Sequence, residues 1–150
     1  MDAKMEKEYM KGGEFLIADQ TTAEVFTPED FTDEHRMIGD TCREYIDNEV
    51  VPNLPRLEAH EWDVARDLVK KAGELGLLGA NIPEEFGGMA LDQTSGCIIA
   101  EMVGRGSGFG STYGAQTSIG LLPILYWGSD ELKKEWIPKI ISGEVVSAYC

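Results

Sequence analysis

Apolar residues recur three and four positions apart through most of this chain, and this spacing restricts it to a helical fold. One helical face is formed by Phe31, Ile38, Cys42, Tyr45, Ile46 and Val50. A second helix is expected from about Trp62 to Leu75, ended by a C-cap glycine at Gly76. Strand-like apolar residues first appear at Val145. We therefore predict an all-α bundle of five to six helices, with a short β-strand beginning at the C-terminus.

Capping signals mark where the later helices begin. Asp92 is expected to cap one helix, and Ser129 with Asp130 is expected to cap the last. Pro138 falls inside the last pattern and should bend or interrupt that helix. Thr27 followed by Pro28 predicts the first helix start.

These signals divide the chain into three parts. Residues 1–26 are predicted to be an N-terminal tail, 27–144 a helical domain, and 145–150 the start of a β-domain. An isolated strand has nothing to pair with in a helical domain. The chain is therefore expected to be cut at a domain boundary.

Composition excludes several classes of function. The net charge of −14 argues against nucleic-acid binding and against docking on an anionic membrane. No apolar run approaches the roughly 18 residues of a membrane span. Three widely spaced cysteines predict no disulfide framework and no metal site, so a reducing, cytoplasmic location is expected.

The sequence shows few residues in a pattern typical of a catalytic or cofactor-binding site. His35 and His60 lie far apart without a partner pattern, and we expect both at the surface. The run Gly104–Gly108 is not preceded by a strand, so it does not indicate a dinucleotide fold.

Three segments together resemble the N-terminal domain of an acyl-CoA dehydrogenase. Residues 31–52 run from Phe-Thr-Asp-Glu-His to Val-Val-Pro, and resemble that family's opening helix. Residues 74–88 read Glu-Leu-Gly-Leu-Leu, then Ile-Pro-Glu-Glu-Phe-Gly-Gly, and resemble its glycine-rich connector. Residues 128–150 resemble the stretch that leads into its flavin site. The tail at 11–17 is similar to that of bacterial long-chain or very-long-chain members.

The resemblance implies a three-part enzyme that binds flavin adenine dinucleotide (FAD). Such an enzyme converts a fatty acyl-CoA to a trans-2-enoyl-CoA in fatty acid β-oxidation. A glutamate of its C-terminal domain removes the α-proton, and the electrons pass to electron-transfer flavoprotein. The resemblance further implies a homotetrameric parent. No catalytic residue is implied within these 150 residues, so the chain alone should be inactive and should bind no FAD.

The resemblance also implies site residues. Tyr149 and Cys150 match the edge of the FAD site, while Gln116, Thr117 and Gly120 match the wall of the acyl-chain pocket. A glycine leaves volume that a longer acyl tail fills favourably, at ~0.8 kcal/mol per buried methylene. Helix packing at 116 and 117 and a helix break at 120 are the alternatives.

Two further predictions stay open. Leu77 and Leu91 flank the connector and are candidates for partner binding to electron-transfer flavoprotein. The competing functions are a same-fold acyl-CoA oxidase or flavin monooxygenase, and a free-standing helical binding module.

Overall fold

The computed structural model describes residues 10, 12–19 and 25–149, and all regular structure in this part is helical. The all-α prediction is confirmed. The expected C-terminal strand is not confirmed, because Val145 lies in a bend and 146–149 have no regular secondary structure. The chain forms two units, Met1–Glu34 and His35–Cys150.

The first unit contains two short 3-10 helices among its described residues, η1 (Glu14–Leu16) and η2 (Pro28–Asp30). The carboxylate of Asp30 accepts a hydrogen bond from the Thr27 backbone N–H at 3.1 Å. The Thr27 signal therefore starts a separate turn, and α1 begins later, at Asp33. Most of the predicted tail 1–26 lies outside the described residues.

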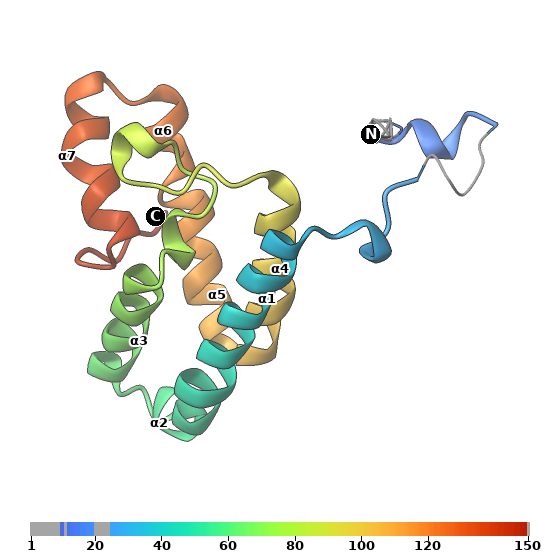
Figure 1. Cartoon of the computed structure of the whole chain (residues 1–150). Helices are drawn as coiled ribbons and strands as arrows, with labels where there is room; N and C mark the ends of the chain where they lie inside the picture. Colours follow the sequence, from blue (N-terminus) through green and yellow to red (C-terminus); the bar gives the residue numbers. More distant parts are fainter. Residues whose placement is uncertain (1–9, 11, 20–24, 150) are drawn as a thin grey trace. The chain divides into compact units, whose positions relative to one another are not determined.

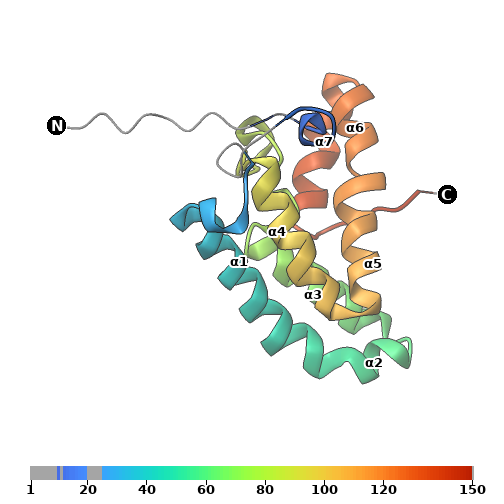
Figure 2. The same cartoon turned by 90° about the vertical axis from the view of Figure 1, so that its right-hand side faces the viewer.

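The second unit is a set of helices joined by short turns (Figures 1 and 2). Its helical segments are α1 (Asp33–Tyr45), η3 (Ile46–Val50), η4 (Val51–Asn53), α2 (Leu54–Glu58), α3 (Trp62–Glu74), η5 (Leu77–Gly79), η6 (Glu84–Phe86), α4 (Gln93–Val103), η7 (Gly104–Gly106), α5 (Gly108–Gly114), η8 (Ala115–Ile119), α6 (Leu122–Trp127) and α7 (Asp130–Ile141).

The described residues thus contain seven α-helices instead of the five or six predicted. Pro52 and Pro55 explain part of the difference, because each stands in the first turn of a new segment. At that position the missing N–H of proline has no intrahelical partner to lose. Pro138 likewise does not interrupt α7, which runs on to Ile141.

Two clusters of buried side chains form the core of this unit. The larger cluster joins α1, α3, α4 and α5, and includes Cys42, Leu68 and Ile99. Within it, the Tyr45 hydroxyl donates to the Leu68 carbonyl at 2.7 Å. The smaller cluster joins α6 and α7 to the connector, and consists of Ile82, Leu121, Ile137, Ile140 and Ile141.

The connector between α3 and α4 (residues 76–91) folds back on itself as a compact loop. Its closing backbone bonds run from Met89 N to Gly79 O at 3.0 Å, and from Ala90 N to Ile82 O at 2.9 Å. Gly88 packs so closely on Ile82 that an added Cβ would lie 2.1 Å from the Ile82 carbonyl oxygen. The connector therefore needs glycine at this position.

Within residues 10, 12–19 and 25–149, no helix combines the length and the apolar character that a membrane crossing requires. The same residues contain no group of three or more His, Cys, Asp or Glu that could hold a metal ion.

Candidate functional site

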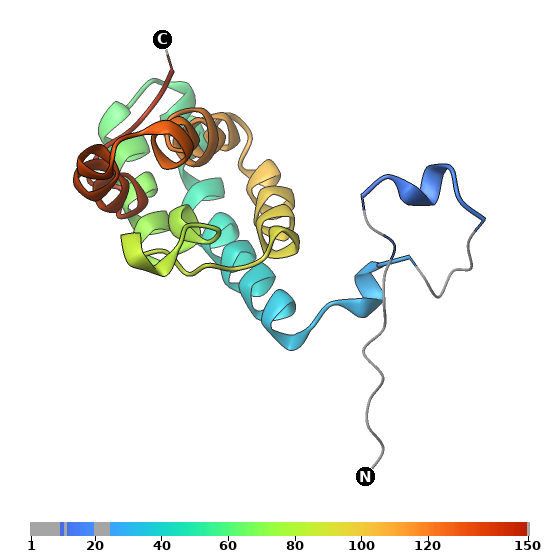
Figure 3. The same cartoon turned by 90° about the horizontal axis from the view of Figure 1, so that it is seen from above.

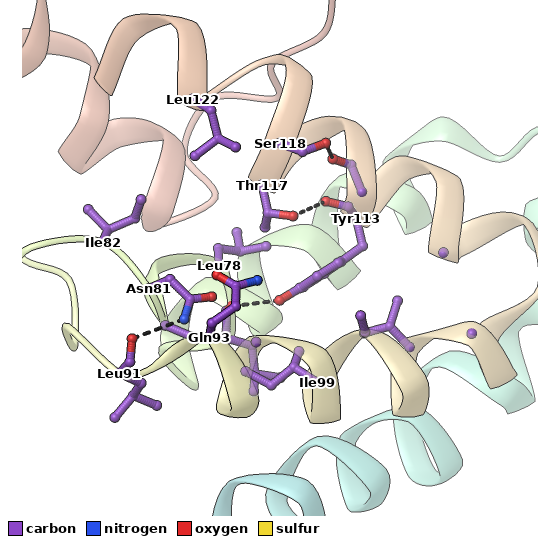
Figure 4. Close-up of a pocket in the computed structure, with 18 of the residues that line it drawn as sticks. Leu78, Asn81, Ile82, Leu91, Gln93, Ile99, Tyr113, Thr117, Ser118 and Leu122 are labelled. Atoms are coloured by element: carbon purple, nitrogen blue, oxygen red, sulfur yellow. Dashed lines mark hydrogen bonds between the residues drawn. The ribbon is translucent and has the colours of Figure 1, made fainter. Parts of the chain in front are cut away.

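A groove of about 750 Å³ lies between α4 and the α5–η8 helix, with the connector as its floor (Figure 4). In Figure 2 these two walls run side by side. Ile99 comes from one wall and Thr117 from the other, while Leu78 comes from the floor. Gly114, in the second wall, has nothing within 4 Å of where a Cβ would lie, whereas the space beside Gly96 is filled by the Asn81 side chain.

Several polar side chains in this groove form hydrogen bonds with the backbone. The Tyr113 hydroxyl donates to the Leu77 carbonyl at 2.6 Å, and the Asn81 amide donates to the carbonyls of Leu91 and Asp92. Burial, followed by the nearby Cys42 and Tyr45, raises the pKa of Tyr113 far above its usual value. The tyrosine is therefore a neutral hydrogen-bond donor. The lining offers mainly carbon surface, which suits an apolar ligand.

The three residues predicted to line the acyl pocket face two different places. Thr117 lines the groove, and its hydroxyl donates to the Tyr113 carbonyl at 2.9 Å. Gln116 is fully buried and faces the C-terminal segment. A Cβ added at Gly120 would lie 2.4 Å from the Ser147 hydroxyl. The space beside Gly120 is thus filled by this chain itself.

The split follows from the local helix geometry. η8 is a π-helix, and its wider turn is closed by a bond from Gly120 N to Ala115 O at 2.9 Å. A π-turn inserts one residue into the helical repeat, so neighbouring side chains shift to other faces. Such single turns are frequent at functional sites. Nothing in the amino-acid pattern indicates it.

Leu77 and Leu91, predicted to bind a protein partner, both line the same groove as Thr117. Leu77 is 1% exposed and part of the larger core, so in this structure it offers no surface to a partner. Leu91 is half-buried at the groove (Figure 4). The structure therefore brings together residues to which the sequence assigned separate roles, and those roles stay predictions.

Of the predicted FAD contacts, Tyr149 is described and Cys150 lies outside the described residues. Tyr149 is 78% exposed and belongs to the segment that follows α7, and Figure 3 shows this segment leading away from the helices to the C-terminus. The FAD contact predicted for Tyr149 stays a prediction.

His35 was expected at the surface, and that prediction is wrong. The side chain is 7% exposed, and its Nε2 lies 2.9 Å from Oδ2 of Asp92, the residue that caps α4. His35 precedes Ile38 by three positions and Cys42 by seven, so the helical spacing already placed it on the buried face.

The Asp92 carboxylate holds two elements together at once. Oδ1 accepts from the Ser95 N–H at 2.8 Å, while Oδ2 meets the histidine of α1. Burial alone would raise the pKa of Asp92, but the bonds from Ser95 and His35 hold it below its usual value. The pair lies outside the groove lining, and its role is to join α1 to the start of α4.

The comparisons with known proteins agree on one family. The acyl-CoA dehydrogenase N-terminal domain family matches residues 32–144. A probable acyl-CoA dehydrogenase of Bacillus subtilis (strain 168) is 48% identical over 98% of this chain and 25% of its own length. The short-chain specific acyl-CoA dehydrogenase of Bos taurus mitochondria is 32% identical over 83% of the chain and 30% of its own.

A solved structure gives the same result. The crystal structure of an acyl-CoA dehydrogenase complexed with FAD from Bacillus anthracis is 50% identical, with a TM-score of 0.86. The match covers 92% of this chain and 24% of that one. The chain thus spans about a quarter to a third of the length of these relatives. It belongs to the acyl-CoA dehydrogenase family and corresponds to that family's N-terminal domain.

Proposed function

We propose that this chain is the N-terminal helical domain of a longer FAD-dependent enzyme that oxidises a fatty acyl-CoA to a trans-2-enoyl-CoA. The observation that carries the proposal is the likeness, at 50% identity, to an acyl-CoA dehydrogenase complexed with FAD. Electron-transfer flavoprotein is the proposed electron acceptor, and the proposed setting is fatty acid β-oxidation in the cytoplasm by a homotetramer.

The contribution proposed for this chain is one wall of the acyl-chain pocket. Thr117, Leu78 and Ile99 present carbon surface to the groove. Each methylene of an acyl tail buried there would contribute ~0.8 kcal/mol. For Gln116 and Gly120 a direct contact with the acyl chain stays a prediction, since their observed contacts are with the C-terminal segment.

The catalytic base is proposed to come from another part of the protein. The described groove lining contains no carboxylate and no imidazole; its ionisable side chains are two phenols, Tyr126 and the buried Tyr113, which is a neutral donor. A base must have a pKa near the working pH to accept a proton effectively. The role left to these residues is to bind the acyl tail and to exclude water from it.

FAD would meet this chain at Tyr149 and Cys150, the proposed edge of its site. When bound, the flavin supplies the acceptor for the hydride removed from the β-carbon. Tyr149 would contact it through the exposed ring and backbone.

The test uses the full-length protein that the gene encodes. Purified protein is titrated without oxygen with acyl-CoAs of short, medium and long chains, and the visible absorption of its flavin is followed. The proposal expects bleaching by at least one of them. A flavin-loaded protein that no acyl-CoA reduces would refute the proposed activity, and rapid reoxidation by oxygen would indicate an oxidase.

The groove itself is tested by Thr117→Phe, with Thr117→Val as the control of similar size. A ring in the groove should lower kcat/KM for the longest accepted substrate by about tenfold or more, and barely affect the shortest. An unchanged chain-length preference would exclude the groove as the acyl wall, even if the enzyme is active.

A further inference from the structure

The side-chain amide of Gln116 has all of its hydrogen-bonding capacity used within this chain. Nε2 donates to the carbonyls of Ile140 at 2.7 Å and of Val145 at 2.8 Å. Oε1 accepts from the Ser147 backbone N–H at 2.7 Å and from its hydroxyl at 3.2 Å. A primary amide offers two donor hydrogens and one acceptor oxygen. The side chain is fully buried; its bond to Ile140 lies in the interior, while the bonds to Val145 and Ser147 are partly buried.

Two of these bonds, to Val145 O and from Ser147 N, follow the hydrogen-bond pattern that a neighbouring β-strand would form. A residue in a parallel ladder donates to the carbonyl before its opposite residue and accepts from the N–H after it. Gln116 does the same around Val146, through Val145 O and Ser147 N. The amide therefore pairs with the backbone of 145–147, although these residues form no strand and no strand is assigned among the described residues.

The same segment is fixed from other sides. Val145 N donates to the Lys139 carbonyl of α7 at 3.2 Å. Ser147 packs against Gly120, where a Cβ would come within 2.9 Å of its backbone carbon. The turn before the segment contains Gly143 at φ 73, and there a Cβ would lie 2.7 Å from the Val69 carbonyl oxygen of α3. Three helices therefore fix where the segment begins.

We propose that Gln116 is a positioning residue: its amide stands in for a β-strand and sets the direction in which Val145–Tyr149 leaves the helices. The consequence for FAD rests on the proposed function, in which Tyr149 forms the edge of the flavin site. We call the bonds from Gln116 to Val145 and Ser147 the clamp. Gln116 holds the segment that leads to the flavin edge, and the adjacent Thr117 lines the groove. The π-helix η8, which contains both residues, would therefore fix the flavin edge relative to the groove.

The test compares Gln116→Met with Ser118→Ala in the full-length protein. Methionine keeps an unbranched side chain of similar length and removes all of the amide's bonds. Ser118 belongs to the same π-helix, and its hydroxyl bonds only within the helix, to Gly114. Hydrogen exchange is followed by mass spectrometry in the peptide containing 145–149 and in peptides of α3 and α4.

The expected result is an increase of about tenfold in exchange at 145–149 in Gln116→Met, with α3 and α4 unchanged. Ser118→Ala should leave the segment as it is. Unchanged exchange at 145–149, or an equal increase throughout the helices, would overturn the proposal. In the second case Gln116 would only be a core packing residue.

A second variant covers the case in which Gln116→Met does not fold. Gly120→Ala adds a methyl group that pushes on Ser147 without changing the buried amide, and Gly114→Ala is its control because nothing lies within 4 Å of that position. Faster exchange at 145–149 is expected in Gly120→Ala but not in Gly114→Ala. Equal exchange in both would overturn the proposal.

The flavin spectrum separates this inference from the proposed function. If the clamp positions the flavin edge, the visible spectrum of bound FAD should shift in Gln116→Met and not in Ser118→Ala. A wild-type protein that binds no flavin refutes the proposed function, while the exchange result still decides the clamp. A bound flavin with an unshifted spectrum refutes the positioning of Tyr149.

Discussion

Gly88 allows a single methyl group to test whether the connector holds the floor of the groove in place. In Gly88→Ala the new Cβ would lie 2.1 Å from the Ile82 carbonyl oxygen and 2.5 Å from its carbonyl carbon. The first contact is about 0.9 Å closer than the 3.0 Å below which Cβ atoms essentially never approach. Both atoms belong to the backbone, so no side chain can rotate away to relieve the contact.

The cost can be worked out from the bonds that must separate. Moving Ile82 away from Gly88 breaks the bond from Ala90 N to Ile82 O and strains the neighbouring bond from Met89 N to Gly79 O. Each contributes about 0.5–1.5 kcal/mol net, and forcing a methyl group into a packed site costs ~1–3 kcal/mol. We expect a loss of about 2–4 kcal/mol from the free energy of unfolding, out of a total of ~5–15 kcal/mol for a domain.

The assay is urea unfolding followed by the helical circular dichroism signal. The control is Gly104→Ala, because a Cβ there meets nothing within 4 Å and the residue is helical. That change should leave the free energy of unfolding equal or up to about 1 kcal/mol higher. If Gly88→Ala lies within about 0.5 kcal/mol of the unsubstituted protein, the reasoning about the connector is wrong.

Three other substitutions or conditions give further predictions. Tyr113→Phe should lower the free energy of unfolding by about 1–3 kcal/mol in urea, because the buried Leu77 carbonyl loses its donor. The pKa of Asp92 is lower in the folded protein than in the unfolded chain. Its contribution to the free energy of unfolding is therefore fully present above the unfolded pKa and is lost as the pH falls through the folded pKa. Asp92→Asn should make the free energy of unfolding depend less on pH on the acidic side. Burial raises the pKa of Cys42 to about 12, whereas Cys97 is exposed. In a Cys150→Ser background, a maleimide should therefore label Cys97 in the folded protein and Cys42 only after unfolding. Rapid labelling of both cysteines in the folded protein would contradict the burial of Cys42.

The helices themselves could be predicted because their apolar spacing and caps are local signals. Asp92 and Ser129 cap α4 and α7 as expected, each accepting a backbone N–H of the first turn. Pro138 was expected to bend or interrupt the last helix, but it lies inside α7 and the helix runs on to Ile141, so here the propensity rule for helix interiors gave the wrong result. The burial of His35 could have been predicted from its helical spacing to Ile38 and Cys42, whereas its partner Asp92, 57 positions away, could not.

The candidate site was only partly predictable. The resemblance pointed to Gln116, Thr117 and Gly120, but the π-turn that directs them to two different places depends on the tertiary structure. Thr117 lines the groove, whereas the other two contact the C-terminal segment. The sequence pattern carries no sign of hydrogen bonds between a side chain and a distant backbone, and the clamp consists of such bonds.

The central claim is that this chain forms part of an acyl-CoA dehydrogenase, and flavin reduction tests it most directly. Full-length protein is loaded with FAD, and an acyl-CoA series is added under anaerobic conditions while the flavin absorption is recorded. The account predicts bleaching by a fatty acyl-CoA together with formation of the trans-2-enoyl-CoA. Bound FAD that stays oxidised with every acyl-CoA in the series would contradict it.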